Sequence, residues 1–248
     1  MISVVIPVYK SATTLVALHE RISQVAALLP VSCEIVYVND ASPDHSLAIL
    51  RQLPPTVSYH IVNLKKNAGQ SSALIAGMAF ARGELVATMD ADLQDEPENL
   101  PTLINALKPG VDVVFGRRQG KYESPGRLLT SHFFKGMVHW FSGRKIPMNA
   151  GLFMVARKDA TGDFTSYLPH APYLIGLIAR AGLQCATVTV DRPGNAFGET
   201  SYTFRKRMGV ARSFFRTLRL PVPKPGPEAA EWLNSHLLAD HLYIARKQ

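Results

Sequence analysis

Short apolar runs alternate with longer amphipathic stretches along the first half of the chain. The apolar runs predict buried strands over residues 2–9, 34–39, 57–64, 85–90 and 112–116. The periodic stretches between them predict helices, including one that Thr13 or Thr14 caps and that runs to about residue 29, and one over residues 71–81. This alternation indicates an α/β fold with a mostly parallel central sheet flanked by helices.

Beyond residue 116 the alternation weakens. The second half predicts an aromatic-rich helix over 128–142, a short strand within 149–156, an apolar helix over 173–181, a strand over 184–190 and a basic helix over 203–220. A Pro-rich linker over 221–227 precedes an amphipathic helix that starts at Glu228 and carries Trp232, Leu233, Leu237, Leu238 and Leu242. We therefore expect a main domain over 1–220, with halves 1–116 and 117–220, and a C-terminal helical appendage over 221–248. The sequence leaves open whether this last helix packs on the domain or forms a homodimer.

Two carboxylates follow the fourth expected strand, in the stretch LVATMDADLQD over residues 85–95. A buried strand cannot carry unpaired charge, so Asp90 and Asp92 must lie where the strand leaves the core. Their i, i+2 spacing places both side chains on one side of an extended backbone. At about 6 Å and an effective dielectric constant of about 20, they repel by roughly 3 kcal/mol. A divalent cation that also holds substrate phosphate relieves this repulsion best. Gln94 adds a neutral oxygen beside the two carboxylates. The structural alternative is a solvated strand end before an acidic helix start.

Polar side chains follow the other expected strands as well. Ligands of such sheets bind outside the carboxyl ends of the strands. Five strand ends that carry polar residues therefore predict a binding site at that edge. These residues are Tyr9, Asp40, Asn67, Asp90 with Asp92, and Arg117 with Arg118.

Composition restricts the class of protein. The chain has 248 residues, a net charge of +8 and two cysteines, Cys33 and Cys185, which form neither a disulfide framework nor a metal-ligand pattern. No signal peptide and no apolar run of about 18 residues is visible, so a cytoplasmic protein, or one bound at the inner face of the plasma membrane, is expected. The positive charge predicts an anionic partner.

The expected helix over 203–220 concentrates this charge on one face. Three interpretations of it differ in the partner. In the first, the basic face is solvated, the other face covers a hydrophobic core, and no partner is needed. In the second, the helix lies on an anionic membrane and gains about 1 kcal/mol of binding free energy per basic residue, enough for reversible attachment. Nucleic acid is disfavoured because no recognition module accompanies the charge. The basic residues are Arg205, Lys206, Arg207, Arg212, Arg216 and Arg219.

Five motifs, in order, resemble one family. They are VVIPVY at 4–9, VNDASPD at 38–44, NAGQSSA at 67–73, MDADLQD at 89–95 and GETSY at 198–202. Over about residues 1–220 the chain resembles the GT-A-fold glycosyltransferases of family 2, in particular the polyprenyl-phosphate hexosyltransferases related to dolichyl-phosphate mannose synthase. The resemblance implies transfer of a hexose from a nucleotide diphosphate sugar to a polyprenyl phosphate, with Mg²⁺ or Mn²⁺, in cell-surface glycan biosynthesis.

The resemblance also assigns residues to roles. Asp90, Asp92, Arg117 and Arg192 are the implied catalytic residues, and Asp90 and Asp92 hold the metal beside Gln94. Arg117 and Arg192 lie near the diphosphate or the acceptor phosphate, and Pro7, Tyr9 and Asp40 hold the base and ribose. The implied donor site also includes Val8, Asn67, Gln70, Ala91, Thr200 and Tyr202.

The chain departs from that branch at Ser201, where Lys is common, at Asn195, where Arg is common, and in lacking C-terminal membrane spans. Between Asp163 and Asp191 there is no carboxylate to act as a base for a hydroxyl acceptor, and the lone His170 there is more often structural. This absence favours a phosphate acceptor. Transfer to a sugar hydroxyl, and a non-catalytic nucleotide-sugar or membrane-binding homologue, remain as alternatives.

Overall fold

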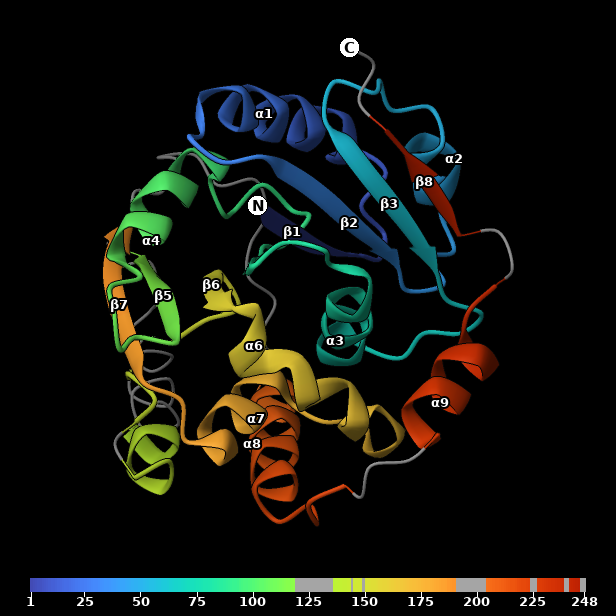
Figure 1. The fold of residues 1–248 in the computed structure, drawn as a ribbon. Coiled ribbons are helices and arrows are strands. Elements are labelled where there is room, and N and C mark those ends of the chain that lie inside the picture. Colours follow the sequence, from blue (N-terminus) through green and yellow to red (C-terminus); the bar gives the residue numbers. More distant parts are fainter. Residues whose placement is uncertain are drawn as a thin grey trace.

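The protein is built around one twisted sheet with helices on both faces (Figure 1). The computed structural model describes residues 1–118, 136–143, 145–148, 150–190, 204–223, 227–238 and 241–245. Within these residues the sheet has eight strands in the order β7-β5-β6-β4-β1-β2-β3-β8. The strands are β1 (Ile2–Val8), β2 (Cys33–Asn39), β3 (Ser58–Asn63), β4 (Leu85–Thr88), β5 (Val113–Arg118), β6 (Met154–Arg157), β7 (Cys185–Val190) and β8 (Leu242–Ile244).

The pairing of the strands confirms the prediction of a mostly parallel sheet. Strands β4, β1, β2 and β3 pair in parallel, and β5 pairs in parallel with β7. Strand β6 is antiparallel to both β4 and β5, and β8 is antiparallel to β3. All strands except β6 and β8 therefore end at the same edge of this described sheet.

Two hydrophobic cores lie on the two faces of the sheet. One core packs α1 (Leu15–Leu28), α2 (Ser46–Leu50) and α4 (Leu100–Ala106) on the sheet, with the short helix η1 (Pro97–Asn99) between β4 and α4. The other face carries α3 (Gln70–Phe80), η2 (Gly162–His170), α7 (Leu174–Ala181), α8 (Phe204–Leu218) and α9 (Glu228–His236). A short α6 (Lys158–Thr161) links β6 to η2, and residues 136–141 are helical.

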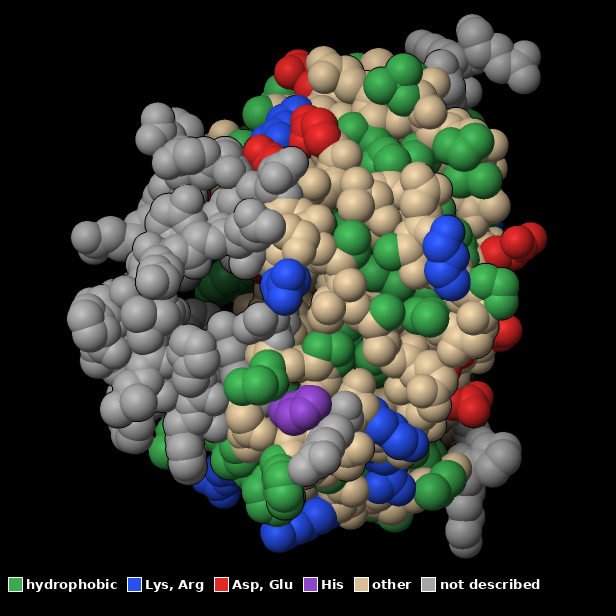
Figure 2. Space-filling view, turned by 90° about the vertical axis from the view of Figure 1, so that its left-hand side faces the viewer, with side chains coloured by type: hydrophobic (Ala, Val, Ile, Leu, Met, Phe, Trp, Pro, Cys, Tyr) green, Lys and Arg blue, Asp and Glu red, His purple; other side chains and the backbone are tan. Residues whose placement is uncertain are grey.

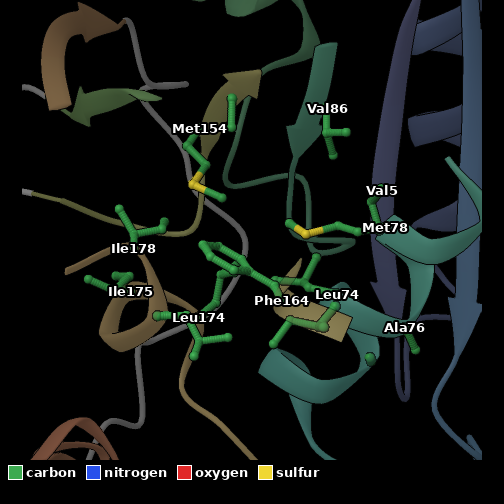
Figure 3. Close-up of a cluster of buried hydrophobic side chains, with 14 of the residues drawn as sticks. Val5, Leu74, Ala76, Met78, Val86, Met154, Phe164, Leu174, Ile175 and Ile178 are labelled. Atoms are coloured by element: carbon green, nitrogen blue, oxygen red, sulfur yellow. The ribbon is translucent and has the colours of Figure 1, made fainter. Parts of the chain in front are cut away.

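Helix α3 is enclosed by the sheet and by the helices that follow it. Every residue of its middle part from Ser72 to Met78 is buried. A Cβ atom at Gly77 would lie 2.5 Å from a Val5 methyl group and 2.7 Å from a Val38 methyl group, so only glycine lets the helix approach β1 and β2 this closely. Figure 3 shows side chains from α3, η2, α7 and β6 that converge in this core. Because α3 is packed between the sheet and these helices, its first turn has a well-defined position.

Several element boundaries differ from the sequence prediction. The fourth strand ends at Thr88 and not at Asp90, because the chain turns at Ala91 and Asp92. Thr14 precedes α1 but makes no side-chain cap, since its hydroxyl donates to the carbonyl oxygens of Ser11 and Ala91. The basic helix is confirmed over Phe204–Leu218. Among the described residues, none of the helices combines the length and the apolar character needed to cross a membrane.

The tail differs most from its prediction. Its helix ends at His236, and Leu242 lies on strand β8, which extends the sheet beyond β3. The physical reason is that β3 would otherwise expose an unpaired edge, and a strand satisfies these backbone groups where a longer helix does not. Trp232, Leu233 and Leu237 pack against the core of the α3 face. The helix therefore packs on the domain, and dimer formation through it stays a prediction.

A buried carboxylate connects this tail strand to the amino end of the sheet. Glu34 is 1% exposed and accepts hydrogen bonds from the Ser3 hydroxyl (2.6 Å) and from the Arg82 amide (2.7 Å). The Arg82 guanidinium lies 2.8 Å from the same carboxylate and 4.3 Å from the centre of the Tyr243 ring. The Tyr243 ring lies 4.4 Å from the ring of His60, whose Nε2 is 3.5 Å from Glu34. The charge of Glu34 is thus compensated by groups that also hold β8.

The pKa of Glu34 makes this network sensitive to acid. Burial by itself raises the pKa, but the nearby His60 ring and the hydrogen bonds from Ser3 and Arg82 outweigh it and hold the pKa at about 2, below the ordinary 4.5. Because the folded-state pKa is the lower one, the stabilisation is complete above pH 4.5 and is lost as the pH falls toward 2. A difference of this size corresponds to roughly 3 kcal/mol of unfolding free energy.

Replacing Glu34→Gln should therefore lower the unfolding free energy by about 3 kcal/mol at neutral pH. The loss should shrink as the pH falls from 4.5 toward 2, because the native protein then loses the same interaction. Urea unfolding at a series of pH values measures this. Glu84→Gln removes an exposed carboxylate two residues after Arg82 and serves as the control. An equal loss in both variants at neutral pH would contradict the assignment.

Gly69, directly before α3, offers a second test of the fold. Its φ of 85° and ψ of 154° lie in a region that side-chain-bearing residues avoid, although no described atom lies within 4 Å of a Cβ placed there. Gly69→Ala should cost about 1–3 kcal/mol through backbone strain alone. Gly151→Ala is the matched control, because a Cβ at Gly151 also meets no described atom within 4 Å and the φ of Gly151 is not positive. It should change the unfolding free energy by less than about 0.5 kcal/mol. Denaturant midpoints with unchanged m values distinguish the two.

Candidate active site

A cavity of about 390 Å³ opens at the edge where the parallel strands end. Loops that follow β1, β2, β3 and β4 supply its walls, together with the start of α3. A cavity of this volume is within the range of small-molecule sites. Its lining residues are Pro7, Tyr9, Ser11, Asp40, Asn67, Gly69, Gln70, Asp90, Ala91 and Asp92.

Asp40 lies directly after β2 and joins two of these loops. Its carboxylate is 3% exposed and accepts hydrogen bonds from the amides of Ala68 (2.6 Å) and Gly69 (3.0 Å). Burial raises the pKa of Asp40, and the two amide hydrogen bonds oppose that rise. The Asn67 side chain donates to the Asp40 carbonyl oxygen at 3.3 Å. The loop before α3 is therefore positioned by the end of β2.

Asp44 and Thr14 connect the remaining loops. The Asp44 carboxylate accepts from the amides of Ala12 and Ser46, both at 3.1 Å, and from the Ser42 hydroxyl at 2.6 Å. Burial would raise its pKa, but hydrogen bonds from Ser42, Ser46 and Ala12 hold the pKa far below its usual range. The Thr14 hydroxyl donates to the Ala91 carbonyl oxygen at 2.5 Å. These contacts fix the loops after β1, β2 and β4 relative to one another.

Two carboxylates of the cavity come from the turn after β4. Asp90 is partly buried and accepts a hydrogen bond from the Gln70 side-chain amide at 2.6 Å, while its backbone amide donates to the buried Asp95 at 3.3 Å. Asp92 is exposed and accepts from the Gln94 backbone amide at 3.0 Å. A turn, and not an extended strand, therefore brings both carboxylates to one cavity. The prediction that an extended backbone places Asp90 and Asp92 on the same side was wrong, although both side chains do line one site.

The charge of the cavity restricts what it can bind. Asp40, Asp90 and Asp92 are carboxylates, and no Lys or Arg is among the described residues that line it. An anionic ligand would enter only together with a cation. Within the described parts of the chain, no three His, Cys, Asp or Glu residues converge on a metal position. Two carboxylates completed by ligand phosphate and water are the usual Mg²⁺ arrangement, so the residues present fit such an ion.

Three non-glycine residues near the strand ends adopt left-handed backbone conformations. Lys10, Ala41 and Leu93 have φ values of 56°, 51° and 61° and follow β1, β2 and β4. Such conformations cost free energy and persist only where the surrounding contacts enforce them, commonly at binding sites. All three loops contribute to the cavity.

The structure brings together most residues that the sequence assigned to the donor site. Pro7, Tyr9, Asp40, Asn67, Gln70, Asp90, Ala91 and Asp92 line the cavity. Val8 is buried in β1 behind it, and Gln94 lies beside Asp92 without being part of the lining. Arg192, Thr200 and Tyr202 lie outside the described residues.

Arg117 is placed away from this cavity. It lies on β5, two strands from β4, and its guanidinium donates to the Thr189 hydroxyl on β7 at 3.0 Å.

Sequence reasoning missed Ser11 and Gly69 as lining residues. The position of Ser11 after β1 and of Gly69 inside NAGQSSA were the available signals.

Solved structures share this fold at low sequence identity. Mannosyl-3-phosphoglycerate synthase from Rubrobacter xylanophilus aligns with a TM-score of 0.68 and 18% identity, over 100% of this chain and 87% of that chain. Glucosyl-3-phosphoglycerate synthase from Mycobacterium tuberculosis, crystallised with Mn²⁺, UDP and glucosyl-3-phosphoglycerate, aligns with a TM-score of 0.64 and 20% identity, over 89% and 81% of the two chains. At these identities the likeness shows the fold.

Curated proteins give closer matches in sequence. An undecaprenyl-phosphate 4-deoxy-4-formamido-L-arabinose transferase of Proteus mirabilis is 31% identical over 214 residues, and an uncharacterized glycosyltransferase of Bacillus subtilis is 29% identical over 213 residues. Both alignments cover 84% of this chain and 65% of the relative. The chain thus spans just under two thirds of the length of these relatives.

The sequence model described as glycosyl transferase family 2 matches residues 3–167, which contain β1 from its second residue, strands β2 to β6 and all residues that line the cavity. The match covers more than half of the chain and agrees with the fold of the solved structures. The chain therefore belongs to glycosyltransferase family 2.

Proposed function

We propose that this chain is a metal-dependent glycosyltransferase that moves a hexose from a nucleoside-diphosphate sugar to a polyprenyl phosphate. One observation carries the proposal. Asp90 and Asp92 share a cavity of about 390 Å³ with Tyr9 and Asp40 at the carboxyl edge of the sheet, in a chain of family 2. In open α/β sheets this edge is where nucleotides bind.

Donor binding follows from the chemistry of the lining. Tyr9 offers a half-exposed ring for a base, and the Asp40 carboxylate and the Asn67 amide offer polar atoms for a ribose. Asp90 and Asp92 would hold Mg²⁺ or Mn²⁺, which compensates the charge of the diphosphate leaving group. The contacts from Gln70 and Gln94 orient the two carboxylates before a ligand arrives. The glucosyl-3-phosphoglycerate synthase structure with Mn²⁺ and UDP is consistent with this class of donor.

A phosphate acceptor is supported by two independent facts. The Proteus mirabilis relative is by name an undecaprenyl-phosphate transferase. In addition, the chain has no carboxylate between Asp163 and Asp191, so the region lacks an ordinary base for a neutral hydroxyl, whereas a phosphate oxygen is already anionic. The two solved relatives are named for phosphoglycerate products, which leaves a soluble phosphorylated acceptor as the competing choice.

An anionic membrane surface is the partner we propose for the region around α8. Trp140 and Phe141 are 65% and 59% exposed, and the Phe141 ring packs edge-on against Phe215 of α8 at 5.0 Å. Met148 and Met208 are also exposed. In Figure 2, Lys and Arg side chains gather with hydrophobic ones toward the lower end of the face, the level at which α8 lies in Figure 1. Exposed aromatic and basic side chains together favour an anionic lipid interface.

Asp90→Asn and Asp92→Asn should each lower sugar transfer by about 100-fold or more, because the diphosphate would lose its charge compensation. Each asparagine keeps one oxygen for the bond from Gln70 or Gln94, so the turn should stay folded. The measurement is transfer of labelled sugar from UDP-, GDP- and dTDP-sugars to a short polyprenyl phosphate, with Mg²⁺ or Mn²⁺ and with chelator. Asp159→Asn, an exposed carboxylate outside the cavity, is the control.

The same assay separates the alternatives. Metal-dependent release of nucleoside diphosphate without a lipid product would indicate a different acceptor, such as a sugar hydroxyl. Binding of a nucleotide sugar without any turnover would favour a non-catalytic homologue. Transfer that survives the chelator and both substitutions would contradict the proposal.

Membrane attachment predicts a second effect. The double substitution Trp140→Ser and Phe141→Ser should weaken binding to vesicles that contain anionic phospholipid by about tenfold or more, since burying a large apolar side chain contributes roughly 1.5–3 kcal/mol. Co-sedimentation with anionic and with zwitterionic vesicles measures it. Val16→Ser changes an exposed apolar residue on α1, across the sheet, and should have no effect. Equal binding of all three proteins to anionic vesicles would exclude this surface.

A further inference from the structure

A second cavity, of about 420 Å³, adjoins the first one. Gly69 and Gln70 line both cavities, and the Gln70 amide donates to Asp90 in the first. The other walls of the second cavity are the first turn of α3, the segment 171–173 and one side of α8. A group bound there would therefore lie next to whatever occupies the first cavity.

The walls of the second cavity are held by hydrogen bonds between its three elements. The Arg216 guanidinium on α8 donates to the Ala171 carbonyl oxygen at 2.6 Å, and the Tyr173 amide donates to the Thr217 hydroxyl at 2.9 Å. The Leu174 amide donates to the Ser71 hydroxyl on α3 at 3.3 Å. Ala171 itself has a φ of 45°, a strained conformation for alanine. The cavity is thus a formed part of the fold.

The two cavities differ in charge. Three carboxylates line the first cavity, whereas Arg216 is the charged residue among the described residues that line the second, and no carboxylate lines it. A guanidinium presents several N–H donors in a geometry that suits phosphate oxygens. Ala68, Pro172 and Val210 add apolar surface beside it. This combination suits an anion that carries an apolar group.

Gly209 keeps the second cavity open. It lies inside α8, where glycine lowers helix stability relative to alanine, and its φ is not positive. A Cβ atom at this position meets no described atom within 4 Å, so neither backbone conformation nor contact with the described residues requires glycine. A larger side chain here would project into space that the cavity uses.

We propose that the second cavity binds the phosphomonoester head of the acceptor, with Arg216 on the phosphate and the apolar wall along the first carbons of the attached chain. The assignment rests on the proposed function and deepens it, because it separates an acceptor site from the metal-dependent donor site. Gln70, at the boundary between the two sites, is placed to keep Asp90 oriented beside the acceptor.

The test uses the full chain and water-soluble probes. Isothermal titration calorimetry compares geranyl phosphate, geraniol, inorganic phosphate and 3-phosphoglycerate as ligands of the native chain and four variants. Arg216→Gln and Gly209→Leu should raise the Kd for geranyl phosphate by about tenfold or more, the scale of a hydrogen bond to a charged group. Gly209→Ala should have a smaller effect. Arg51→Gln removes an equal charge from an exposed residue at the end of α2, across the sheet, and should have none.

The ligands distinguish the source of the phosphate. Geranyl phosphate binding more tightly than inorganic phosphate and 3-phosphoglycerate would support a lipid phosphate, and the reverse order would support a soluble phosphomonoester at the same site. Geraniol binding as tightly as geranyl phosphate would overturn the assignment of an anion site. Native affinity for geranyl phosphate in both Arg216→Gln and Gly209→Leu would overturn the assignment altogether.

Two controls keep this result separate from folding and from the proposed function. Thermal unfolding and nucleotide-sugar affinity should be unchanged in Gly209→Leu, which shows that the fold and the first cavity persist. If the native chain transfers no sugar but the variants lose geranyl phosphate binding, the proposed reaction fails and the cavity assignment stands. If sugar is transferred with an unchanged acceptor KM in both variants, the reaction stands and the cavity assignment fails.

Discussion

The buried carboxylate of Asp40 is the interaction on which the site depends. A carboxyl group with almost no exposure needs hydrogen-bond partners, and the amides of Ala68 and Gly69 supply them. This pairing joins the end of β2 to the start of α3 and thereby positions Gln70, which contacts Asp90 after β4. Three parallel strands and one buried helix are linked in this way, so the cavity is formed before any ligand binds.

The two edges of the sheet have different roles. At the amino edge the Glu34 carboxylate is compensated by Ser3 and Arg82, and the Tyr243 ring, which contacts Arg82 and His60, attaches the last strand there. At the carboxyl edge the carboxylates of Asp90 and Asp92 face a cavity. Compensated charge stabilises the fold, whereas charge that faces a cavity is available to a ligand. The compensated carboxylate and the carboxylates of the cavity thus lie at opposite edges of one mostly parallel sheet.

Sequence reasoning predicted the candidate site well where residues follow strands directly. Tyr9, Asp40 and Asn67 could be placed at one edge because parallel strands share their direction, whereas Pro7 was assigned only by the family resemblance. It failed where the chain turns. The strand expected through Asp90 ends at Thr88, and a turn with Leu93 in a left-handed conformation brings Asp92 to the cavity. Arg117 lies within β5, which runs to Arg118 and not only to residue 116, and the intervening β6 separates that strand from β4. The order of strands in a sheet has no local sequence signal.

The sequence by itself determined the α/β class, the existence of the first five strands along the chain, the carboxylate pair and its edge, because each depends on local hydrophobic period and on strand direction. Only the tertiary structure decided that the tail forms β8 on the edge of β3, since strand pairing depends on which edge is left exposed. It also decided that a second, positively charged cavity lies beside the first. That cavity is lined by residues from 68–72, 171–173 and 209–216. These segments are far apart in the sequence, so no local sequence pattern predicts that they come into contact.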